Sequence, residues 1–100
     1  MDTLRGSSIR ISIDNASSPK NKHLSGTVIY ERHGNKLIVK LSETLQSGEM
    51  RSDMMLLTPQ FKKERFVFDT PKTEIMINGT LISEDDEHQQ PGISGILSLN

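Results

Sequence analysis

Three histidines and one acidic run come closest to a catalytic or metal-binding set in this sequence. His23, His33 and His88 stand in predicted loops or turns, and none has the spacing of a metal ligand. The run EDDE at residues 84–87 could hold a hard cation through its carboxylates, but it lacks the spacing of a calcium-binding loop. We therefore predict no catalytic residue and no metal site.

Motifs of the common enzyme classes are also missing from the sequence. There is no cysteine to act as a thiol nucleophile or zinc ligand. The serines do not form the Gly-x-Ser-x-Gly turn of hydrolases, and no glycine-rich phosphate-binding loop occurs. These observations predict a protein that is not an enzyme and uses no cofactor.

The length and composition predict one small domain over residues 1–100. Hydrophobic residues make up 33% of the chain and aromatic residues 4%, so the core must consist mainly of aliphatic side chains. No apolar run is long enough to span a membrane, and MDTLRGSSIR does not resemble a signal peptide. We expect a cytoplasmic protein in which residues 1–7 form a flexible tail.

The net charge of −1 is unevenly distributed along the chain. Residues 1–40 hold seven Lys/Arg against three Asp/Glu, whereas residues 41–100 hold five against ten. This asymmetry fits ordinary solvated faces or an anion site in the N-terminal part. General nucleic-acid binding is disfavoured, because there is no dense basic run and few aromatic residues for stacking.

Alternation of apolar and polar residues predicts strands in the first half of the chain. In SIRISID (8–14) the three isoleucines share one face, which is typical of a half-buried strand. SGTVIYER (25–32) and NKLIVKLS (35–42) flank a tight turn and predict a hairpin. Its inward row is expected to be Leu37, Val39 and Leu41.

The second half of the chain is predicted to hold further short strands. DMMLL (53–57) fits a strand better than a helix, FVF (66–68) fits a strand, and ISGILSLN (93–100) closes the chain as a strand. TPQFKKER (58–65) is predicted to form either a single helical turn or a hairpin loop, and residues 84–92 an acidic loop. We predict an all-β fold, a small antiparallel β-barrel of six to seven short strands.

Asn78-Gly79 leaves two alternatives for residues 73–86. The dipeptide is a strong signal for a tight hairpin. The stretch also fits one strand in which Gly79 lies at a bend or bulge where the sheet curls. We favour the single strand, with Ile75, Ile77, Gly79 and Leu81 on one face.

A basic stretch beside an aromatic residue is the candidate for contact with a partner protein. Phe61 could be an exposed aromatic anchor, and Lys62, Lys63 and Arg65 follow it directly. The methionines could add an adaptable apolar surface, although they more often fill a core that is short of aromatics. The relevant ones are Met50, Met54, Met55 and Met76.

The order of these features resembles that of PilZ domains, which are small six-stranded bacterial barrels. Arg5 and Arg10 surround the start of a first strand, and GTVIYERHGNKLIVKL supplies two strands around a turn with Gly34. LQSGE, EIMINGTLI and PGISGILSLN complete the same layout over nearly the whole chain. In this family, cyclic di-GMP is bound by an Arg-x-x-x-Arg stretch and by an Asp/Asn-x-Ser-x-x-Gly turn. The guanidinium groups of the arginines bind phosphates and stack on guanine.

This sequence departs from both PilZ motifs. Four residues separate Arg5 from Arg10, and IYERHG keeps only Gly34 of the second motif. Ile29 stands at the acidic position, and Glu31 stands at the serine, where it would repel a dianionic ligand. The resemblance therefore implies a degenerate member that no longer binds nucleotide and acts as an adaptor through contacts with an unidentified protein, in the regulation of motility, pili or surface polysaccharide.

Three alternatives stay open at this point. A cyclic di-GMP receptor would use Arg5, Arg10 and Gly34 as its ligand-binding residues. A small phage-type inhibitor would bind a host protein. A weaker resemblance to Sm-like proteins rests on SGTVIYERHGNKLIVKL and IMINGTLIS, but their wide separation and the sparse basic surface do not suit RNA binding.

Overall fold

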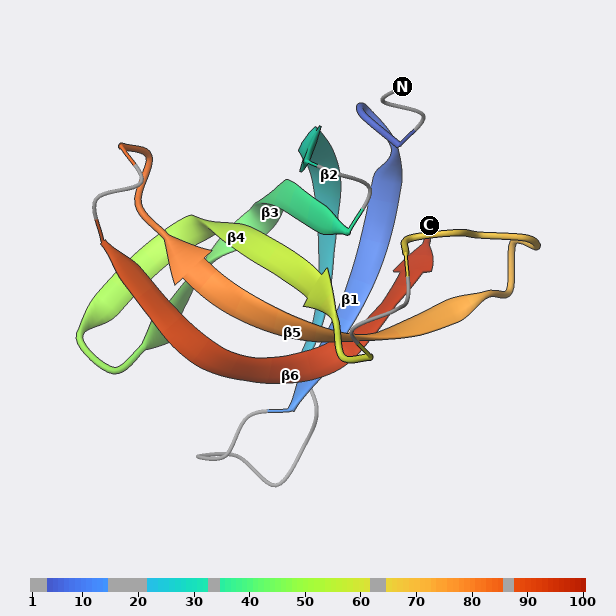
Figure 1. Cartoon of the computed structure of the whole chain (residues 1–100). Helices are drawn as coiled ribbons and strands as arrows, with labels where there is room; N and C mark the ends of the chain where they lie inside the picture. Colours follow the sequence, from blue (N-terminus) through green and yellow to red (C-terminus); the bar gives the residue numbers. More distant parts are fainter. Residues whose placement is uncertain (1–3, 15–21, 33–34, 62–64, 86–87) are drawn as a thin grey trace.

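Six antiparallel strands form a closed barrel in the computed structural model shown in Figure 1, which describes residues 4–14, 22–32, 35–61, 65–85 and 88–100. Each strand pairs with the next along the chain, and β6 pairs with β1 to close the barrel. The predicted all-β fold and small antiparallel barrel are confirmed. The strands are β1 (Ser8–Asp14), β2 (Lys22–Arg32), β3 (Lys36–Ser47), β4 (Met50–Pro59), β5 (Glu74–Ile82) and β6 (Gln89–Leu99).

Alternate side chains of the strands fill the barrel. Ile9, Ile11 and Ile13 of β1 are all buried, as the alternation in SIRISID predicts. They pack with isoleucine, leucine and valine side chains from the other five strands, together with Met55 and Phe66. Burial of each such side chain contributes about 1.5–3 kcal/mol, so this aliphatic interior is the main source of stability.

The hairpin predicted for the first half of the chain is confirmed. β2 and β3 pair from Gly26↔Leu41 to Arg32↔Lys36, and the predicted turn at residues 33–34 lies outside the described residues. The inward row of the hairpin is buried as predicted, at Leu37, Val39 and Leu41.

β5 is one continuous strand, so the tight-hairpin interpretation of Asn78-Gly79 is wrong and the single-strand interpretation is confirmed. Its buried face consists of Ile75, Ile77, Gly79 and Leu81. The pairing of β5 with β6 shifts register between Gly79 and Leu81, which places the irregularity where a bend or bulge was expected.

Three predictions for the second half of the chain are corrected by the structure. FVF is not a strand: residues 65–68 carry no strand pairing, because no neighbouring strand lies alongside them in the described sheet. The alternative of a helical turn at 58–65 is wrong at its start, because Thr58 and Pro59 end β4. The acidic loop is shorter than predicted, because β6 already begins at Gln89.

The residues just before β1 extend the contact of the chain with β2. Residues 1–3 lie outside the described residues. The amide of Gly6 donates to the Val28 carbonyl at 2.8 Å, and the amide of Val28 donates to the Ser7 carbonyl at 3.0 Å. Leu4 packs against the core, so the described part of the predicted tail lies on the barrel.

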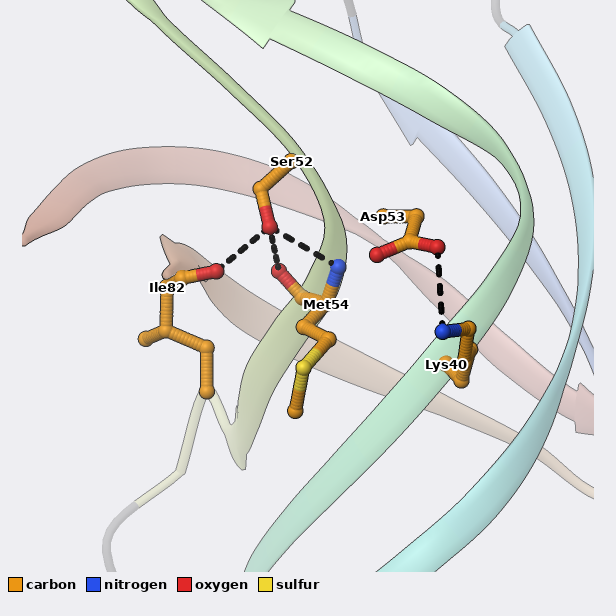
Figure 2. A network of polar contacts seen from close by, with 5 residues as sticks. All are labelled: Lys40, Ser52, Asp53, Met54 and Ile82. Atoms are coloured by element: carbon orange, nitrogen blue, oxygen red, sulfur yellow. Dashed lines mark hydrogen bonds and ion pairs between the residues drawn. The ribbon is translucent and has the colours of Figure 1, made fainter. Parts of the chain in front are cut away.

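An irregularity in β3, where four residues are not paired with β4, lies beside polar contacts made by β4. After the pair Lys40↔Met54, the next pair is Leu45↔Ser52, so four residues of β3 stand opposite Asp53 alone. Figure 2 shows the Ser52 hydroxyl between two backbones: it accepts from the Met54 amide at 3.0 Å and donates to the Ile82 carbonyl at 2.5 Å. The ammonium group of Lys40 lies 3.3 Å from the Asp53 carboxylate.

The Ser52→Ala variant is expected to unfold with about 1–2 kcal/mol less free energy than the wild type. The change leaves one backbone acceptor and one donor without their partner in a half-buried position. Urea unfolding at equilibrium measures this loss. The Ser25→Ala control, at an exposed position of β2, should stay within about 0.5 kcal/mol of the wild type, and equal losses in both variants would contradict a role for Ser52 at this irregularity.

Candidate functional site

A surface pocket of about 340 Å³ lies between β5 and the segment that connects β4 to β5. β5 begins next to the C-terminal end of β6, where Glu74 pairs with Ser98, so the pocket lies at this end of the two strands. Apolar and charged side chains both line the pocket. Its lining residues are Phe61, Arg65, Val67, Thr73, Glu74, Ile75 and Met76.

Hydrogen bonds to β5 fix the start of the connecting segment. The amide of Gln60 donates to the Met76 carbonyl at 2.9 Å, and its side-chain amide donates to the Ile77 carbonyl at 3.2 Å. These bonds continue the pairing of β4 with β5 by one residue beyond Pro59. Phe61, the next residue, therefore lies beside the outward face of β5.

A buried phenylalanine sets the orientation of the residues on the other side of the pocket. Phe66 is only 6% exposed and belongs to the hydrophobic core, although it lies in no strand. Its neighbours Arg65 and Val67 are exposed and line the pocket, and the Val67 amide donates to the Arg65 carbonyl at 2.9 Å. The inward side chain of Phe66 thus holds the two flanking side chains outward.

A hydrogen-bonded turn leads into the first residue of β5. The Thr73 amide donates to the Thr70 carbonyl, and the Thr70 amide donates to the Thr73 hydroxyl, both at 3.1 Å. The Thr70 hydroxyl also accepts from the Lys72 amide at 3.2 Å. This turn leads directly into Glu74, the acidic residue that lines the pocket.

Three of the six large apolar side chains that are exposed on the described surface line this pocket, and a fourth, Ile96, lies beside Met76 on the neighbouring strand. Phe61, Val67 and Met76 are 57%, 56% and 47% exposed. Ile96 on β6 is 38% exposed and is the strand partner of Met76. Single exposed apolar residues are common on protein surfaces, but a contiguous group of them is typical of an interaction site.

Two opposite charges border this apolar surface without pairing with each other. Arg65 and Glu74 both line the pocket, and among the described residues neither has an ion pair. We use the name contact patch for the six residues that carry the apolar surface and its charges. They are Phe61, Arg65, Val67, Glu74, Met76 and Ile96.

Two of the predicted protein-contact residues, Phe61 and Arg65, lie in the contact patch. Lys62 and Lys63 lie outside the described residues. Met76, one of the methionines considered for an apolar contact surface, points outward because the isoleucines on either side of it point inward. Ile96 could not be predicted as part of the patch, because only the pairing of β6 with β5 brings it there.

The four methionines, for which a core role and a surface role were both considered, are divided between the core and the surface. Met55 is fully buried, as expected for a methionine that fills the core. Met50 and Met54 are half-buried. Only Met76 of this group is exposed, so one methionine contributes to the contact patch.

The arginines considered for nucleotide binding do not line this pocket. Arg10 lies two strands from Glu74, because both residues are paired with Ser98 of β6. Arg10 points outward from β1 and donates to the Asn100 side chain at 3.1 Å. Asn100 lines a polar pocket of about 280 Å³ that also contains Lys40, whose ammonium group pairs with Asp53. Arg5 is exposed, and Gly34 lies outside the described residues.

No group of three or more histidine, aspartate or glutamate side chains that could hold a metal ion occurs in the described part of the chain. Over the same residues, no helix has the length and apolar character needed to cross a membrane. Comparison with known proteins finds no matching family model, no matching curated protein and no matching solved structure.

Proposed function

We propose that this protein is a non-enzymatic binding module that contacts another protein through the contact patch. The observation that carries the proposal is that exposed Phe61, Val67 and Met76 line one pocket, with exposed Ile96 next to Met76 on β6. Apolar anchors in a pocket supply most of the binding energy of protein interfaces, and charges at the rim supply specificity. We place this contact in the cytoplasm, as the cysteine-free sequence predicts.

The resemblance to PilZ domains stays a prediction beside this proposal. A closed barrel of six strands is compatible with that layout, but small barrels host many unrelated functions. An adaptor role resembling that of degenerate members of the family agrees with a site built for protein contact. The role in motility, pilus or surface-polysaccharide regulation rests on the resemblance alone.

Site-specific crosslinking tests the proposed function. A photo-crosslinking residue, benzoylphenylalanine, replaces Met76 at the centre of the contact patch. The matched control replaces Tyr30, which is similarly exposed at 43% but lies on β2 on the other side of the barrel. Illumination in a lysate of the native host, followed by mass spectrometry, identifies the crosslinked chains.

We expect adducts between polypeptide chains from position 76 and few from position 30. A second change, Phe61→Ser, should reduce the yield from position 76, because it removes an exposed apolar anchor without opening the core. Equal yields from both positions would indicate general apolar adhesion. That result, or no polypeptide adduct from position 76, would overturn the proposed function.

A further inference from the structure

We propose that the partner of the contact patch is a second copy of this chain, in a dimer with two-fold symmetry. The inference rests on the proposed function, because it assigns the occupant of the same surface. The patch carries both one cation and one anion beside a common apolar centre. A surface of this composition can be complementary to itself.

A two-fold axis that passes between Arg65 and Glu74 would place each charge of the patch opposite its counterion. In such an interface, a contact of residue i with residue j of the other copy always occurs twice. When Arg65 faces the partner's Glu74, Glu74 of the first copy faces the partner's Arg65. One arrangement therefore neutralises all four charges, which have no ion pair within the described part of a single chain.

The apolar centre can be covered in the same arrangement. Phe61, Val67 and Met76 stand at the pocket that Arg65 and Glu74 also line. The pocket volume of about 340 Å³ lies at the low end of the range for ligand sites, which suits an inserted side chain. A Phe61 side chain, more than half exposed in the single chain, is available to enter the partner's pocket.

The charge pattern favours a second copy over a strongly acidic or a strongly basic partner. A strongly acidic partner would bring like charge to Glu74, and a strongly basic partner would bring like charge to Arg65. A second copy brings the opposite charge to both. The net charge of −1 per chain adds little repulsion between two copies.

The dimer is expected to be weak. Each copy contributes six patch residues, whereas a standard interface uses about 20–30 residues a side. Sedimentation velocity must therefore reach protein concentrations of about 1 mM, where a contact worth only about 4 kcal/mol is half populated. We expect the mass to rise with concentration toward twice the 11.2 kDa of one chain.

Charge reversal tests the symmetry directly. The Arg65→Glu variant places two acidic pairs across the interface, and the Glu74→Arg variant places two basic pairs there. Each should raise the dissociation constant at least about tenfold. An equimolar mixture of the two variants should form a heterodimer, because every introduced charge then faces an opposite one. The double variant Arg65→Glu/Glu74→Arg should form a homodimer again.

The Arg51→Glu variant serves as the control, because Arg51 is exposed on β4 outside the contact patch. It should dimerise like the wild type. A wild type that stays monomeric, or a mixture of the two single variants that fails to associate, would overturn the dimer. If position 76 nevertheless crosslinks to a different protein, the proposed function stands and only the identity of the partner is wrong.

Discussion

The Gly95→Ala variant is expected to lose about 3 kcal/mol or more of its free energy of unfolding. A Cβ atom on Gly95 would lie 2.4 Å from the Ser12 carbonyl oxygen and 3.1 Å from the Ile13 Cα. Both neighbours are backbone atoms of β1, so no side-chain rotation can relieve the overlap. The two strands must move apart, at the pairing that closes the barrel.

A second buried glycine provides the control for this prediction. A Cβ atom on Gly79 would lie 2.7 Å from the Met55 sulfur, at the flexible end of a side chain that can change its rotamer. Gly79→Ala should therefore cost clearly less than Gly95→Ala. Urea unfolding of both variants at equilibrium provides the comparison. Equal losses of unfolding free energy would show that the close approach of the β1 backbone to Gly95 does not determine the effect of the substitution.

The consequence of a widened β1–β6 pairing goes beyond the lost free energy. A domain of this size has about 5–15 kcal/mol of stability in total, so the change removes a large fraction of it. Opening the barrel also exposes two strand edges, which are prone to pair with other chains. We expect the Gly95→Ala variant to aggregate during refolding at concentrations at which Gly79→Ala stays dispersed.

The strands could be predicted where local pattern and tertiary pairing agree. The isoleucines of β1 face the interior because a half-buried strand requires this alternation. The sequence around Asn78-Gly79 is a stronger test, since the local rule favours a turn. Pairing of β5 with both β4 and β6 over this stretch overrides the local preference.

The prediction of a strand at FVF (66–68) was wrong. Phe66 is buried and Val67 is exposed, as in a strand, but no described strand pairs with this segment. A pattern of period two indicates which side chains face the core and does not supply a hydrogen-bonding partner. Prediction of the contact patch was incomplete for a related reason. Ile96 joins it through pairing between distant parts of the chain, which local sequence does not encode.

The Phe66→Ala variant is expected to lose about 3–5 kcal/mol of its free energy of unfolding. Among the residues that the structure describes, Phe66 is the only aromatic one that is buried in the core, and it enters from the connection between β4 and β5. Its removal leaves a cavity that the short flanking segment cannot fill without moving. The matched control is Phe61→Ala, because Phe61 lies in the same connection but is 57% exposed. It should cost less than about 1 kcal/mol.

Phe66 also connects the stability of the core to the geometry of the contact patch. Its inward side chain holds Arg65 and Val67 outward, so Phe66→Ala should weaken protein contact although position 66 itself is buried. Phe61→Ala should weaken contact as well, but with little loss of stability. Unfolding in urea and crosslinking from position 76 separate the two effects. A Phe66→Ala variant that loses stability but crosslinks like the wild type would show that the patch residues are held by the turn at Thr70 and Thr73 and by Gln60 alone.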